Sequence, residues 1–200
     1  MTFQEVVREA RRLSSDERLF RRTNPYGHGF GQIIDENSIA SIVVDESKRD
    51  IIAVETHKPF PNHYGQVLVS GSGALIELAG DANQCWRRFA LVKELMHVLH
   101  PRSDGTINQM EMRTWLARAS RFNLPDGQKQ LDPETMALCL AMELLLPWID
   151  RGCLSDWHHN DHETNYHIAK KLLVPKEVIC QYFELGYAEK SFEFNKLIVP

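Results

Sequence analysis

The chain has 200 residues, of which 43% are hydrophobic and 25% are charged, and its formal net charge at pH 7 is −4. Such a chain can bury one sizeable core without disulfides or a structural metal, and its charge gives no reason to expect a nucleic-acid-binding surface over the whole protein. The N-terminus is locally basic. Its arginines form either a local patch or the solvated faces of one or two helices, and we favour the second: Arg8, Arg11, Arg12, Arg18, Arg21 and Arg22.

The cysteines and the apolar segments exclude several other classes. No two cysteines have Cys-x-x-Cys spacing, which argues against a cysteine zinc site and against a redox pair. The N-terminus has no apolar run typical of a signal peptide, and no stretch approaches the ~20 apolar residues of a membrane span. We therefore expect a cytoplasmic protein with free thiols at Cys85, Cys139, Cys153 and Cys180.

The first part of the chain reads as helix, loop and then strands. Residues 2–13 have the apolar spacing of one helix face, and the glycine-rich segment 24–31 predicts a loop. Short β-rich runs follow, and the Gly-Ser-Gly segment between the last two predicts a hairpin. The first run could instead complete a helix that starts at Glu36, because short apolar runs are ambiguous. The predicted strands are 39–44, 51–56, 66–70 and 74–78.

Residues 82–100 predict an amphipathic helix that Asp81 caps and Pro101 ends. Within it, the segment from Lys93 to His97 has the layout of the zinc-protease motif His-Glu-x-x-His, but lysine stands at the first histidine position. In that motif, two imidazoles four residues apart bind one zinc from the same helix face. The glutamate acts as a base toward a metal-bound water.

Two further helices are predicted after Pro101. The first covers about residues 106–121, and we expect it to pack on the domain rather than to form a lid. The second covers 133–146, with Asp132 as its cap and Pro133 at its first position. Glu134 then lies in the first turn, where the helix dipole stabilises a carboxylate. Glu143 on the same helix is expected to be a surface charge.

The C-terminal part predicts two short helices and a tail. His158 and His162 are four residues apart, but the residues between them look like a helix cap, so we do not favour a metal site there. Residues 166–173 and 176–185 predict a loose helix-turn-helix without a basic recognition face. The tail 187–200 is rich in apolar residues, and it docks either on its own domain or on a partner subunit.

Two blocks of the sequence resemble the ImmA/IrrE family of metallopeptidases. Residues 87–100, RRFALVKELMHVLH, resemble the family signature Arg-Arg-Phe-Thr-Leu-Ala-His-Glu-Leu-Gly-His-x-x-x-His. Residues 134–147, ETMALCLAMELLLP, are similar to its Glu-x-x-Ala-x-x-Phe-Ala-x-x-Leu-Leu-Met-Pro. The resemblance implies an α+β, zincin-like fold in which a small, mostly antiparallel sheet packs against several helices. On this basis we divide the chain into an N-terminal segment 1–31, a metallopeptidase-like domain 32–186 and a tail 187–200.

By the same resemblance, Glu94 is the general base, and His97 and Glu134 are zinc ligands. The third ligand is missing, because a lysine ammonium has no free lone pair. His100 could substitute for it, although it points partly away from His97, and we favour a supporting hydrogen bond. Without the metal, Lys93 either pairs with Glu134 as a built-in cation or extends into solvent.

The resemblance leaves two functions open. The chain is either a non-catalytic relative whose cleft binds a protein, such as a transcription regulator, or an active zinc endopeptidase that cleaves a helix-turn-helix repressor with an altered ligand set. We favour the first, because losing one of three ligands weakens zinc binding. No cofactor is expected under the first function, and zinc is expected under the second. Neither involves a membrane or direct contact with nucleic acid.

Overall fold

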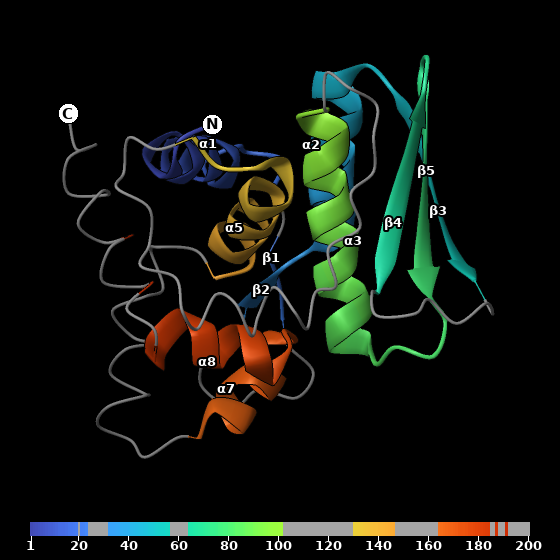
Figure 1. The fold of residues 1–200 in the computed structure, drawn as a ribbon. Coiled ribbons are helices and arrows are strands. Elements are labelled where there is room, and N and C mark those ends of the chain that lie inside the picture. The colour runs from blue at the N-terminus through green and yellow to red at the C-terminus, as the bar shows by residue number, and fades with distance from the viewer. Residues whose placement is uncertain are drawn as a thin grey trace.

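The computed structural model describes residues 1–19, 21–23, 32–56, 64–101, 130–146, 164–184, 187 and 191. In these ranges the chain forms an α+β fold, as predicted. The helices are α1 (Phe3–Ser14), α2 (Glu36–Ser47), α3 (Gln84–Leu99), α5 (Pro133–Leu145), α7 (Asn165–Leu172) and α8 (Lys176–Glu184). The strands are β1 (Arg21–Thr23), β2 (Gln32–Ile34), β3 (Asp50–Thr56), β4 (Gly65–Ser70) and β5 (Gly73–Ala79). Helix α3 lies between the sheet of β3, β4 and β5 on one side and α5 on the other (Figure 1).

Several predicted features fall outside these ranges: the loop 24–31, the helix 106–121, the histidines 158 and 162, Cys153 and most of the tail. The helices predicted at 166–173 and 176–185 are present as α7 and α8, and the side chain of Thr164 caps α7. Within the described residues, no helix is both long enough and apolar enough to cross a membrane.

The segment 39–44 is part of helix α2, so the alternative helix prediction is right and the strand prediction is wrong. The Asp35 side chain accepts a hydrogen bond from the Ser38 N–H and thereby caps the helix. Ile39, Ile42 and Val43 have the three- and four-residue spacing of one helix face, and all three are buried. That spacing distinguishes the segment from a strand, which would expose every second residue.

Helices α3 and α5 begin with side-chain caps of the same kind. Asp132 caps α5 and Pro133 is its first residue, as predicted. Helix α3 begins later than predicted: Asn83 is the cap, and its side chain accepts from the N–H of Trp86. Asp81 cannot serve, because it lies in a tight turn closed by the hydrogen bond from Ala82 N–H to Ala79 O.

The three-stranded sheet has the order β3-β5-β4. Strands β4 and β5 form the predicted antiparallel hairpin, and its turn contains Gly71 with a φ of 53°, a left-handed conformation that glycine adopts readily. Strand β3 runs parallel to β5. The sheet is therefore mixed rather than mostly antiparallel, because the hairpin folds back to place its second strand beside β3.

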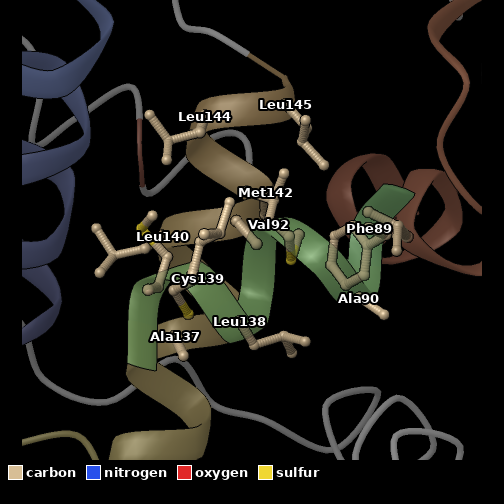
Figure 2. Packing of buried hydrophobic residues seen from close by; sticks show 14 of the residues in the cluster. Phe89, Ala90, Val92, Ala137, Leu138, Cys139, Leu140, Met142, Leu144 and Leu145 are labelled. Carbon is tan, nitrogen blue, oxygen red and sulfur yellow. The ribbon is translucent and has the colours of Figure 1, made fainter. Parts of the chain in front are cut away.

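The core is one cluster of buried side chains that joins α1, α7 and α8 to the central helices. Helices α3 and α5 contact each other, and Figure 2 shows Val92 of α3 among the labelled side chains of α5 where the two helices cross. Helix α1 packs on α5 through its predicted apolar face, which is buried throughout: Phe3, Val6, Val7, Ala10 and Leu13.

Two described residues of the tail contact this core. The ring of Tyr187 meets Phe3 edge-on, with 5.4 Å between the ring centroids. The Ser191 hydroxyl donates a hydrogen bond of 2.6 Å to the carboxylate of Glu143. Glu143 is therefore a buried residue and not the predicted surface charge. At these two positions the tail docks on its own domain.

Arg88 is a buried cation that joins four elements of the fold. Its guanidinium donates to the carbonyl oxygens of Ile34 (2.6 Å), Leu172 (3.1 Å) and Leu173 (3.2 Å), and to the carboxylate of Glu36 (3.1 Å). These contacts connect α3 to β2, to the first turn of α2 and to the C-terminal end of α7. The last carbonyls of a helix have no partner within the helix, so Arg88 satisfies groups that would otherwise be buried and unpaired.

We expect Arg88→Ala to lower the free energy of unfolding by about 3 kcal/mol, because it leaves Glu36 and three carbonyls without their donor. The neighbouring Arg87 supplies a matched control, since it forms an exposed ion pair with Glu55. Arg87→Ala should cost less than about 1 kcal/mol. Urea unfolding of both variants measures the difference, and equal losses would contradict the assigned role of Arg88.

Candidate functional site

Lys93 lies in the interface between α3 and α5, with a relative exposure of only 8%. Its ammonium donates a hydrogen bond to Glu134 Oε2 at 3.0 Å and lies 2.8 Å from Glu94 Oε1. Glu134 belongs to the first turn of α5, where the N-terminal end of the helix dipole favours a negative charge. A single buried cation thus connects neighbouring carboxylates from the two central helices.

His97 is one helical turn after Lys93 and faces the same carboxylate. Its Nε2 lies 3.1 Å from Glu134 Oε1, and its side chain is 8% exposed. The two oxygens of Glu134 therefore face different partners, the ammonium of Lys93 and the imidazole of His97. The structure brings together four of the residues that the sequence singled out, which we call the group around Lys93: Lys93, Glu94, His97 and Glu134.

The ionisation of this group follows from two opposing effects. Burial alone would lower the pKa of Lys93, but the charges and hydrogen bonds of Glu94 and Glu134 outweigh burial, so the pKa is raised above its ordinary value. Burial also acts to raise the pKa of Glu134, yet the close imidazole of His97 and the charge of Lys93 lower it to about 2. At neutral pH, Lys93 is therefore an ammonium and Glu134 a carboxylate.

The side chain of His100 faces α1 and not the group around Lys93. Its Nε2 lies 3.5 Å from Glu9 Oε1 on α1. Hydrogen bonds from Arg12 and the nearby imidazole of His100 lower the pKa of the Glu9 carboxyl to about 2, against the effect of partial burial. Glu9 is thus the partner of His100, and this contact joins the C-terminal end of α3 to α1 outside the group around Lys93.

The residues around Lys93 do not fit a catalytic zinc with three protein ligands. Such a site needs three deprotonated donors and one open position for water. His97 and Glu134 offer two donors, but the third position carries an ammonium that its partners keep protonated. No group of three or more His, Cys, Asp or Glu side chains suited to a metal ion occurs in the described ranges.

The arrangement has clear chemical consequences for Glu94. Its side chain is only 3% exposed, and its Oε1 lies 2.8 Å from the ammonium of Lys93. A general base in a zinc peptidase must instead face a water bound to the metal. The contact between Lys93 and Glu94 within α3 therefore occupies the carboxylate that such a base would use.

The structural roles of two buried charged residues, Arg88 and Glu143, were not predicted from the sequence. Arg88 is part of the quoted signature, but its partners are backbone carbonyls of distant segments, which no local pattern identifies. Glu143 did carry a signal. It is the one charged residue in the otherwise apolar run 136–146, and a helix that is apolar on all sides is buried on all sides.

Comparison of the chain with protein-family models, with curated proteins and with solved structures found no match.

We expect Lys93→Ala to lower the free energy of unfolding by roughly 3 kcal/mol, because the buried carboxylates lose their cation. Lys170 is exposed on α7. Lys170→Ala is the control and should cost less than about 0.5 kcal/mol. Chemical denaturation of the full chain measures both values. A loss for Lys93→Ala as small as the control's would exclude a structural role for the ion pair.

The low pKa of Glu134 predicts a specific acid sensitivity. Its pKa in the fold is about 2, against the ordinary value of 4.5. The group therefore contributes stability that is fully present above pH 4.5 and is lost as the pH falls toward 2. Glu134→Gln should be less stable than the wild type at neutral pH, and the gap should narrow between pH 4.5 and 2. A constant gap in urea unfolding across this range would contradict the prediction.

Proposed function

We propose that this chain is an ImmA/IrrE-like protein of zincin-like fold with a degenerate zinc site, and that it acts as a non-catalytic, protein-binding regulator. One observation carries the proposal: the Lys93 ammonium, at the position of the first zinc ligand, donates to Glu134, the position of the third ligand. The resemblance of residues 87–100 and 134–147 to the family blocks supports the fold, and so does the approach of His97 to Glu134.

The ion pair supports retention of the packing of α3 against α5 without zinc chemistry. Two buried carboxylates without a cation repel each other, which raises the pKa of one of them and destabilises the fold. Lys93 supplies the compensating positive charge on a flexible stem with three donors. It cannot polarise a carbonyl or activate water as zinc does. A lysine here preserves the packing of α3 against α5 and removes hydrolysis.

The partner that we propose is a protein, and its class follows from the family resemblance. Family members of this kind act on helix-turn-helix transcription regulators. A relative without a catalytic metal would bind such a regulator and not cleave it. We do not propose direct binding of nucleic acid or of a membrane.

An active zinc endopeptidase is the second candidate. The observation in its favour is that Glu94, His97 and Glu134 lie together, as a base and two ligands must. For this function Lys93 would have to lose its proton and leave Glu134, against a raised pKa. We therefore place this candidate second.

Zinc content separates the two candidates. We expect the isolated wild-type chain to contain much less than one zinc per chain, because one of three ligands is absent. Lys93→His should bind about one zinc per chain when zinc is supplied, since it restores the third donor on the same helix face. Elemental analysis after gel filtration measures both values.

Two variants serve as controls for the gain of zinc. Lys93→Gln removes the ammonium without restoring an imidazole, and should stay free of zinc. Lys93→His combined with His97→Ala should lose the zinc that the single variant gains. A tightly held zinc in the wild-type chain, retained in the presence of a chelator, would overturn the non-catalytic function and favour the peptidase.

A further inference from the structure

The three-stranded sheet has one face against α3 and a second face with an apolar row across all three strands. Residues that pair directly across neighbouring strands lie on the same face of the sheet. Ala74, Ile76 and Leu78 of β5 are buried, and α3 contacts this strand and β4. The alternate residue Leu75 therefore belongs to the opposite face, which we call the outer face.

The register assigns further apolar side chains to the outer face. Leu75 pairs with Ile52 of β3 and with Leu68 of β4, so the three residues form one row. Glu77 pairs with Val54 of β3 in the next row. Ile52 is 61% exposed, Leu68 45% and Val54 38%. Figure 1 shows the sheet at one side of the molecule, with α3 against its other face.

This composition is unusual for a sheet face that meets water. A sheet covered on one face alternates apolar and polar residues along each strand. Here β3 reads Asp-Ile-Ile-Ala-Val-Glu-Thr, with apolar residues on both faces, as in a sheet that is covered twice. Contiguous exposed apolar patches of this kind mark interaction sites.

The charges on the strands indicate the chemistry of the partner. On the outer face the strands carry the acidic residues Asp50 and Glu77. Glu55 pairs with Leu78 on the opposite face and forms an ion pair with Arg87. None of the three strands contains a lysine or arginine. Glu77 lies on the outer face, where the Gln66 side chain donates to its carboxylate. A second copy of this chain would bring the same acidic residues together, and like charges oppose association. A partner with basic residues beside its apolar ones is complementary to this face.

We propose that the outer face docks an amphipathic helix of another protein, with an apolar stripe bordered by lysine or arginine. A helix with its side chains is about 10 Å across, and the axes of the two outer strands lie about 10 Å apart, so one helix covers the row formed by Ile52, Leu75 and Leu68. Helix α3 contacts β4 and β5 on the opposite face of the sheet. The docking surface is separate from the group around Lys93 and does not depend on whether that group binds metal.

The test uses two synthetic helical peptides of about 18 residues, or five turns. Both carry leucines at positions i, i+3, i+4 and i+7, and one has lysines and arginines at the flanking positions where the other has glutamates. Fluorescence anisotropy measures their binding to the full chain, to Ile52→Ser/Leu68→Ser, to Glu77→Gln and to Tyr166→Ser. Tyr166 is 59% exposed on α7, so its variant is the control for loss of an exposed apolar side chain.

We expect the basic peptide to bind the wild type about tenfold or more tightly than the acidic peptide does. The double variant should weaken binding of the basic peptide about tenfold, Glu77→Gln should weaken it by a smaller factor, and Tyr166→Ser should leave it unchanged. Equal binding of the two peptides, or equal binding to the wild type and the double variant, would overturn the proposal. So would the absence of binding to the wild type.

Two further measurements address other occupants of the outer face. Sedimentation of the wild type alone should show a monomer, and a dimer that Ile52→Ser/Leu68→Ser abolishes would replace the proposed partner by a second copy. A cysteine at Ile52→Cys should react with a maleimide as fast as one at Tyr166→Cys. Much slower reaction at position 52 would show that another part of this chain covers the face, and would also overturn the proposal.

Discussion

A charge removed from water must be paired, and this constraint shapes the centre of the molecule. Helix α3 carries Arg88, Lys93 and Glu94 in its buried part. Each has a partner there: Arg88 the carbonyls at three positions and Glu36, Lys93 the carboxylates of Glu94 and Glu134. Burying an unpaired ion costs several kcal/mol. The elements around α3 must therefore be placed where their polar groups can reach it.

The two cations of α3 hold different parts of the fold. Arg88 connects the first half of α3 to α2, to β2 and to the end of α7 through fixed, planar donor geometry, which suits several acceptors at once. Lys93 connects the second half to α5 through one flexible stem. Hydrophobic packing brings α3 and α5 together, as Val92 and Met142 illustrate in Figure 2. The ion pairs restrict which register of that packing is acceptable.

The sequence predicts those features of the fold that depend on neighbouring residues, such as helix boundaries and buried helix faces. Asp132 and Pro133 determine where α5 begins, and the periodic apolar faces predicted α1 and the central helices. The approach of Lys93 to Glu134 was also a prediction, because the two blocks that resemble one family imply that their ligand positions converge. Contacts between segments that are distant in the sequence could not be predicted. The parallel pairing of β3 with β5, the contacts of Arg88 with distant carbonyls and the approach of His100 to Glu9 join segments whose separation in sequence carries no local signal.

An ammonium and a zinc ion differ in what they leave open to a ligand. This difference separates the role of the residues around Lys93 from that of the outer face of the sheet. Both are cations that hold carboxylates together, but zinc offers an open coordination position and Lys93 has only donors, two of which already face Glu94 and Glu134. The contact between Lys93 and Glu134 thus holds α3 against α5. Recognition of another protein can also use apolar surfaces that folding leaves exposed to water. The outer face of the sheet is such a surface, since water covers Ile52 and Leu68, whose transfer into an apolar contact is favourable.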